Sequence, residues 1–154
     1  MLTFPLTVYY DASCPLCASE MHALKARDRD GRLLLVDCST PGFDDRGFAA
    51  EGITQAAMLA RIHARDARGR WLQGVDVFVE AYRVAGFERI ATALENSWLR
   101  PWFVRIYPWI ARHRFSLSRL GLFRTYNRIA ARARRSDASV DCGGRCERSG
   151  RASG

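Results

Sequence analysis

Residues 8–25 read VYYDASCPLCASEMHALK and hold the change from an extended to a helical pattern that decides the fold. The residues before Asp11 form a short apolar run typical of a buried strand. After the cysteines, apolar residues recur at helical spacing as far as Leu24. Cys14 and Cys17 therefore lie two residues apart at a predicted junction between a strand and a helix.

Pro15 sets the local geometry of this cysteine pair. A residue that precedes proline is disfavoured in the helical region, whereas proline itself is well suited to the first position of a helix. This predicts Cys14 as the N-cap and Pro15 as the first helical residue. The sulfur of Cys14 then faces the free backbone N–H groups of Leu16 and Cys17 and the positive end of the helix dipole. Both favour the thiolate and lower the pKa of Cys14.

Cys17 lies one turn into the predicted helix, within disulfide reach of Cys14 and turned toward the interior. A nucleophilic thiolate at an exposed helix start, with a resolving thiol one turn further, is what two-step thiol–disulfide exchange requires. The residues therefore predict a redox pair. Asp11 has two interpretations: it caps the turn, or it takes the proton from Cys17 during exchange.

Other interpretations of the cysteines stay open at this point. The pair could pack as two small hydrophobic residues, or it could supply half of a zinc site. Zinc needs four ligands, and the other closely spaced cysteines, Cys142 and Cys146, lie in a tail predicted to be disordered. Cys38 is predicted to be a core or loop thiol. His22 and His63 fall on predicted exposed faces and receive no role. We expect no metal and no cofactor.

The remaining chain continues an alternation of strands and helices. The predicted elements are a strand over 33–36 that is buried on both faces, a short helix over 44–51, a half-exposed strand over 58–64, a turn over 66–69, a returning strand that begins at Trp71, and a helix over 75–82. The order is β-α-β-α-β-β-α. The fold class is therefore α/β, and this order is the thioredoxin-like one.

Charge is distributed unevenly over the 154 residues, whose formal net charge is +8. Residues 1–95 carry 11 basic and 13 acidic side chains, whereas residues 96–154 carry 13 basic and 3 acidic ones. We predict a thioredoxin-like domain over 1–95, a helical, basic and aromatic extension over 96–135 that packs on it, and a disordered tail over 136–154.

The sequence predicts a cytoplasmic protein. Its N-terminus lacks the basic residue and cleavage site of a secretory signal, and no window of 18 apolar residues occurs. In a reducing compartment, a pair of cysteines two residues apart is more consistent with catalysis or metal binding than with a structural disulfide.

The extension interleaves arginines with large apolar residues, and three interpretations fit this composition. The apolar residues are Trp98, Trp102, Phe103, Ile106, Tyr107, Trp109 and Ile110. We favour their packing as core on the first domain. Alternatively, the segment lies on an anionic membrane surface, as basic tryptophan-rich helices do. Nucleic-acid binding is not expected, because no nucleic-acid-binding signature is present.

Taken together, these segments resemble a known family. The stretch DASCPLC, residues 11–17, resembles the D-x-x-C-P-x-C signature of the DCC family of thiol-disulfide oxidoreductases. The stretches LLLVDCSTPGF, MLARIHARDARGRWLQGVDVF and WIARHRFSLSRL also resemble segments of that family, so the resemblance covers about residues 5–120. It implies a thioredoxin-like fold, with Cys14 as the attacking and Cys17 as the resolving thiol, acting on a disulfide-containing protein or a small thiol.

One departure from thioredoxins bears on the substrate. Those proteins carry a cis-proline before the third strand that helps to hold the substrate chain, but GITQAAMLARI, residues 52–62, has no proline. Either Ala57 or Met58 fills that place, or the site does not hold protein substrates in the usual way. The use of glutathione is open. The alternative function is a redox-silent thioredoxin-like module that docks on a membrane or protein partner through its extension.

Overall fold

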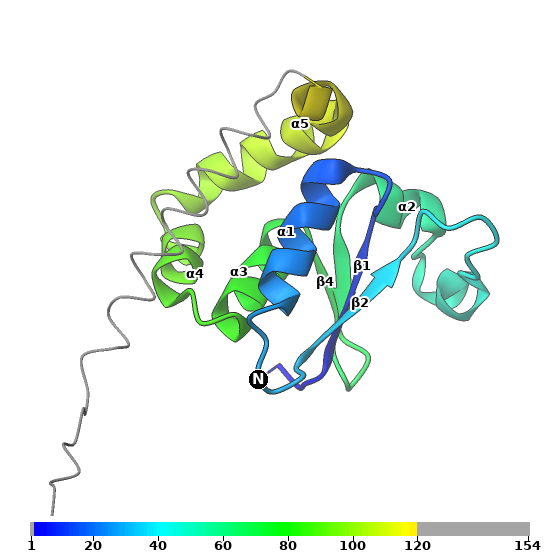
Figure 1. The fold of residues 1–154 in the computed structure, drawn as a ribbon, viewed down its shortest axis with the longest axis horizontal. Helices are drawn as coiled ribbons and strands as arrows, with labels where there is room; N and C mark the ends of the chain where they lie inside the picture. The colour runs from blue at the N-terminus through cyan, green and yellow to red at the C-terminus, as the bar shows by residue number, and fades with distance from the viewer. Residues whose placement is uncertain (1, 120–154) are drawn as a thin grey trace, which may run out of the picture.

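A mixed four-stranded sheet forms the centre of the computed structural model, which describes residues 2–119 (Figure 1). Its strands are β1 (Leu6–Tyr10), β2 (Leu33–Asp37), β3 (His63–Arg65) and β4 (Trp71–Gln73), in the order β2-β1-β3-β4. β1 and β2 run parallel, whereas β3 is antiparallel to both β1 and β4. β1 is therefore an interior strand, and it carries the chain directly to the cysteine pair.

Within residues 2–119, six helical segments connect or follow these strands. They are α1 (Pro15–Lys25), the 3-10 helix η1 (Arg46–Glu51), α2 (Gln55–Ala60), α3 (Val75–Val84), α4 (Glu88–Glu95) and α5 (Arg100–Arg119). The predicted α/β class is confirmed, and the arrangement is compatible with a thioredoxin-like fold.

Both faces of β1 are buried, because helices cover the sheet on each side. Val8 is fully buried in the cluster that also contains Leu24 of α1 and Phe87, which precedes α4. Tyr9 points the opposite way, into a second cluster with Met58 of α2. Side chains alternate between the faces of a strand, and burial on both faces explains the nearly continuous apolar run of β1.

Two predictions about the strands are wrong in detail. The half-exposed strand predicted over 58–64 begins only at His63, because Thr54 caps α2 by accepting a hydrogen bond from the Ala57 N–H (3.2 Å), and the helix continues to Ala60. The strand predicted to be buried on both faces is the edge strand β2, in which Leu34 is 45% exposed.

Helix α5 lies across the end of the molecule where α1 begins, and it contacts α1, α3 and α4 (Figure 1). Tyr107 packs against the core, as predicted for the aromatic residues of the extension. The same prediction is wrong for Trp98, Trp102 and Trp109, which are exposed. Trp102 and Trp109 belong to α5, which can bury only one side against its neighbours, and they lie on the other side. Trp98 lies in the turn before that helix.

Within residues 2–119, no helix is both long and apolar enough to span a membrane. The part of the predicted extension over residues 120–135 lies outside the described residues, as does the tail predicted to be disordered.

Candidate active site

The turn between β1 and α1 is held in place from both sides. The Asp37 carboxylate, at the end of β2, accepts a hydrogen bond from the Ala12 N–H (3.1 Å), and Asp11 accepts hydrogen bonds from the N–H (3.0 Å) and hydroxyl (2.5 Å) of Ser13. These contacts fix the chain immediately before Cys14. As the sequence predicts, Cys14 is the N-cap of α1, with extended backbone angles (φ −88°, ψ 109°), and Pro15 opens the helix.

The two thiols of the pair are in contact. Cys17 Sγ lies 2.9 Å from Cys14 Sγ and donates a hydrogen bond to it, and the Cys17 N–H donates a second one to the same sulfur (3.4 Å). Both cysteines are free thiols in this structure. The Cys14 side chain therefore makes the usual N-cap interaction, in which its sulfur accepts a hydrogen bond from a backbone N–H of the first turn.

These contacts separate the pKa values of the two thiols. The hydrogen bond from the Cys17 thiol is the largest cause that lowers the pKa of Cys14 to about 6. Burial opposes this shift, while the Cys17 N–H, the charge of Arg114 and the Leu16 N–H add to it. The same hydrogen bond, together with burial, raises the pKa of Cys17 well above its usual value. The lower pKa makes Cys14 the more readily ionised thiol of the pair, and Cys17 donates the hydrogen bond between them.

The exposure of the two thiols is the reverse of what the sequence predicts. Cys14 has no exposed surface, whereas Cys17 is half-buried and lines a cavity. The prediction of an exposed nucleophile is wrong, because it considered only the helix start. Side chains of α5, at the far end of the described chain, also border the pair.

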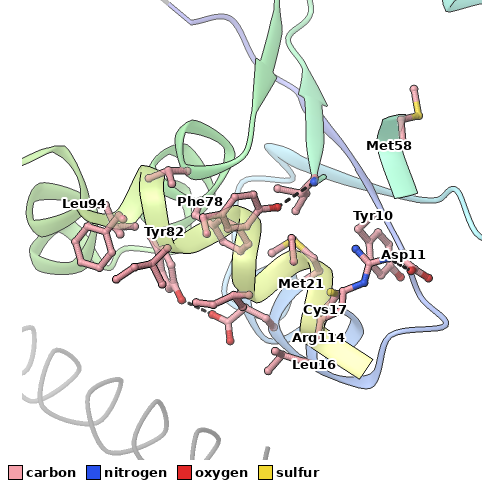
Figure 2. Close-up of a pocket in the computed structure, with 18 residues that line it drawn as sticks. Tyr10, Asp11, Leu16, Cys17, Met21, Met58, Phe78, Tyr82, Leu94 and Arg114 are labelled. Atoms are coloured by element: carbon pink, nitrogen blue, oxygen red, sulfur yellow. Dashed lines mark hydrogen bonds and ion pairs between the residues drawn. The ribbon is translucent and has the colours of Figure 1, made fainter. Parts of the chain in front are cut away.

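Arg114 of α5 is the contact that local sequence reasoning missed. Its guanidinium is paired with the carboxylate of Asp11, and both side chains are almost fully buried. Figure 2 shows Arg114 reaching from α5 toward Asp11 beside Cys17. Its charge favours the Cys14 thiolate. The only signal in the sequence was that Arg114 falls within the arginine-aromatic stretch WIARHRFSLSRL.

Asp11 is placed both to hold the turn and to pair with Arg114. One of its oxygens accepts the two hydrogen bonds from Ser13, and the other accepts from Arg114. It also lies close enough to Cys17 to raise the pKa of that thiol. The structure therefore brings together Asp11, Cys14 and Cys17, with Pro15 and Leu16 at the helix start between them.

The segment before β3 differs from the prediction made for Ala57 and Met58. Both residues belong to α2 and do not directly precede β3, although Met58 lines the cavity beside Cys17. Ile62 is the residue directly before β3. Its N–H donates to the Tyr107 hydroxyl (3.1 Å), and its carbonyl accepts from the Gly74 N–H (2.9 Å), so both main-chain groups of Ile62 are used within the protein.

A cavity of about 280 Å³ lies between α5 and the helices α1 and α3, with Cys17 in its wall (Figure 2). Its apolar lining residues are Leu16, Met21, Met58, Ile62, Val75, Phe78, Leu94, Phe103, Ile106, Ile110 and Ala111. Its polar residues are Tyr10, Asp11, Glu20, Tyr82, Tyr107 and Arg114. The candidate site thus joins a dithiol to a mostly apolar space.

Cys38, His22 and His63, three further cysteine and histidine residues considered from the sequence, do not line the cavity. Cys38 is buried in the core beside Tyr9 and Met58, and burial raises the pKa of its thiol to about 11. His63 is also buried, contrary to the prediction, while His22 is exposed. Among residues 2–119, no cluster of three or more histidine, cysteine or acidic side chains could hold a metal ion. Cys142 and Cys146, which the zinc interpretation requires, lie outside the described residues.

Comparison with known proteins gives a family match over most of the chain. The model of the family described as DCC1-like thiol-disulfide oxidoreductase matches residues 8–120, which include every residue of the site. An uncharacterized chloroplastic protein of Arabidopsis thaliana is 27% identical over 88 residues, which make up 56% of this chain and 40% of that protein. The matched part is thus less than half of that relative. No solved structure matches the chain.

Proposed function

This chain belongs to the DCC1-like thiol-disulfide oxidoreductase family, and we propose that it catalyses thiol–disulfide exchange through Cys14 and Cys17 on a thioredoxin-like fold. The observation that carries the proposal is the contact between the two thiols: the sulfurs are 2.9 Å apart, and Cys14 caps the helix. A low-pKa thiolate beside a protonated thiol is the reduced state that two-step exchange starts from.

The reduction of a substrate disulfide then takes two displacements. The Cys14 thiolate attacks one sulfur of the substrate, the substrate S–S bond breaks, and the first substrate thiolate leaves while a mixed disulfide forms on Cys14. Cys17 next loses its proton to a nearby base, from which the proton passes to a substrate thiolate, and the Cys17 sulfur attacks Cys14 Sγ. The second substrate sulfur leaves as a thiolate, and the enzyme holds a Cys14–Cys17 disulfide. Two electrons pass from the dithiol to the substrate, and the reverse sequence oxidises a dithiol.

The positive charges around Cys14 favour both the reduction and the oxidation of a substrate by this reaction. The helix start and Arg114 stabilise a thiolate on Cys14 whether that thiolate is the attacking group or the leaving group. Asp11 lies near Cys17 and is the candidate acceptor for its proton, although its hydrogen bonds equally support a role in holding the turn. We propose Pro15 and Leu16 as supporting residues, because they form the first helical turn after Cys14.

Trapping experiments test the assignment of the two roles. Cys14→Ser should abolish the reduction of a small disulfide, whereas Cys17→Ser should stop after the first displacement and accumulate a mixed disulfide on Cys14. Mass spectrometry of the intact protein under non-reducing conditions detects that adduct. An adduct that forms on Cys17 in Cys14→Ser and not on Cys14 in Cys17→Ser would reverse the roles, and an adduct with neither variant would end the proposal.

The exposed side of α5 favours a second candidate function, docking on an anionic membrane surface. Trp102, Ile106 and Trp109 recur at helical spacing and are 64%, 47% and 56% exposed. Arg105 and Arg112 are exposed beside them. Tryptophans flanked by arginines suit the interface of an anionic bilayer. This contact is compatible with the redox function and also with a redox-silent module.

Vesicle co-sedimentation tests this candidate. The full chain should pellet with vesicles that contain anionic lipid, and Trp102→Ala/Trp109→Ala should weaken the binding. Zwitterionic vesicles provide the comparison for the charge contribution. Equal pelleting of the full chain and the double variant would exclude this face of α5 as the docking surface.

We also propose that the protein is cytoplasmic, because a reducing compartment keeps a pair of free thiols such as Cys14 and Cys17 in the reduced state. The Arabidopsis relative is described as chloroplastic.

A further inference from the structure

We propose that the substrate of the Cys14–Cys17 pair is a small apolar disulfide that binds in the cavity beside Cys17. This inference rests on the proposed function and deepens it by naming the class of substrate. Three separate features of the cavity carry it: the route to Cys14, the chemistry of the walls and the occupied main chain before β3.

The route to Cys14 leads through the cavity. Because Cys14 has no exposed surface, a disulfide on the outside of another folded protein does not touch its sulfur. Cys17 lies in the cavity wall, and its sulfur is 2.9 Å from that of Cys14. A molecule that contacts Cys17 from inside the cavity is therefore separated from Cys14 by about one atom. Arg114 lines the same cavity as Cys17, and its charge favours the thiolate of Cys14.

The walls of the cavity favour an apolar ligand. Most of the lining residues are apolar, and several of the polar ones have partners within the protein: Arg114 pairs with Asp11, and the Tyr82 hydroxyl donates to Glu20 (2.5 Å). Tyr107 accepts from the Ile62 N–H. The Arg114 Nε is buried and has no hydrogen-bond partner among the described residues. A ligand with several polar groups would still lose more hydrogen bonds to water than this one donor can replace, whereas an apolar ligand gains from leaving water. The volume of about 280 Å³ is close to the lower end of the range of about 300–1,000 Å³ for small-molecule sites.

The main chain before β3 does not accommodate a peptide substrate. An extended peptide binds a sheet by pairing its backbone with free N–H and C=O groups. The N–H and C=O of Ile62, the residue next to β3 at the cavity, already bond to Tyr107 and Gly74. A substrate that needs no backbone pairing fits this site better than a polypeptide does.

The first experiment compares two disulfides of the same size. Di-n-propyl disulfide and bis(2-hydroxyethyl) disulfide have the same number of non-hydrogen atoms and differ only in a methyl or a hydroxyl group at each end. The pre-reduced full chain and one disulfide should yield the Cys14–Cys17 disulfide and two thiols in a single turnover. After correction for the rates with free dithiothreitol, the apolar disulfide should react about 10-fold faster or more at low concentration.

A pair of variants on α5 locates the binding site. Ala111 lines the cavity and Val104 does not, although both belong to α5. Ala111→Phe should fill the cavity and remove the preference for the propyl compound, while Val104→Phe adds the same side chain outside it and should keep the preference. Thermal unfolding of both variants checks that α5 remains packed.

The binding of a ligand that cannot react tests the cavity site separately from the exchange reaction. Butyl propyl sulfide, in which a methylene group replaces one sulfur of di-n-propyl disulfide, cannot exchange. It should raise the unfolding temperature of the unmodified chain and slow the alkylation of Cys17, and Ala111→Phe should remove both effects. Binding of the sulfide with no turnover of either disulfide would retain the cavity site and overturn the exchange function.

Three results would overturn the cavity proposal and leave the exchange function standing. They are equal corrected rates for the two disulfides, no effect of the sulfide on the unfolding temperature or on Cys17 alkylation, or sulfide binding that Ala111→Phe leaves intact. Faster single-turnover reduction of insulin than of di-n-propyl disulfide, at equal disulfide concentration, would identify a protein disulfide as the substrate and would equally overturn the proposal.

Discussion

Arg114 donates a hydrogen bond to Asp11 across 103 positions of sequence, and this ion pair joins α5 to the turn that carries Cys14. Both side chains are almost fully buried. The contact places a positive charge beside the dithiol, and Arg114 also lines the cavity. One arginine of α5 therefore contributes both to holding the turn and to stabilising the Cys14 thiolate.

Removal of this arginine should change both the pKa of Cys14 and the stability of the fold. Arg114→Ala removes a positive charge that favours the thiolate, so the pKa of Cys14 should rise. It also leaves the carboxylate of Asp11 buried without its partner, which should lower the free energy of unfolding by about 3–5 kcal/mol. Chemical denaturation and the pH dependence of Cys14 alkylation measure the two effects.

Arg112→Ala is the matched control for this prediction, because Arg112 is an exposed arginine on the same helix. It should leave both quantities nearly unchanged. The double variant Asp11→Asn/Arg114→Ala removes the unpaired carboxylate and should recover part of the lost stability. An Arg114→Ala protein with the alkylation profile of the unmodified chain would show that its charge does not act on Cys14.

The pH dependence of alkylation in the unmodified chain reports the thiolate directly. The pKa of Cys14 is lowered to about 6, chiefly by the hydrogen bond from Cys17, so this thiol should be protonated and slow below that pH and should reach its full rate well below pH 8.5. Because Cys14 is buried, its alkylation should be slow at every pH, while the midpoint of the profile reports its pKa. Cys38 is the internal control, since the pKa of this thiol is raised to about 11. A midpoint for Cys14 near 8.5 would contradict the geometry of the pair.

A pair of substitutions at Cys17 separates its hydrogen bond from its sulfur. Cys17→Ala removes the donor that lowers the pKa of Cys14 most, so that pKa should rise toward the value of a free thiol. Cys17→Ser keeps a side-chain donor at the same place and should give a smaller increase. The alkylation midpoint of Cys14 measures both. A midpoint in both variants equal to that of the unmodified chain would indicate that the helix start and Arg114 alone stabilise the thiolate.

The parts of the site that the sequence predicts are those fixed by neighbouring residues. Pro15 restricts Cys14 to an extended backbone and begins the helix, so the N-cap and the Cys14–Cys17 contact follow from the residues of one turn. The part of the site that α5 supplies could not be predicted in this way. It depends on where α5 packs, and neither Arg114 nor Tyr107 differs in local pattern from the other arginines and aromatic residues of the extension.

The errors in the strands have a related cause. Residues 58–64 alternate in polarity, but the cap at Thr54 begins a helix that continues through the first part of that stretch. An apolar run over 33–36 predicts burial, but only the strand order shows that β2 lies at the edge of the sheet. A pattern of side chains describes one strand or helix, whereas its neighbours decide how much of it is covered.

The hydrogen bond between Tyr107 and Ile62 should stabilise the position of α5 over the site. Tyr107→Phe keeps the ring and removes the hydroxyl that accepts from the Ile62 N–H, which leaves a main-chain donor without its partner. We expect the free energy of unfolding to fall by about 1–3 kcal/mol. The Ile62 amide should also exchange its hydrogen faster, while the Ala64 amide in β3 remains protected because the sheet is retained. Unchanged exchange at Ile62 would mean that α5 does not hold this main-chain group, and the Ile62 N–H would then be open to pairing with a peptide substrate.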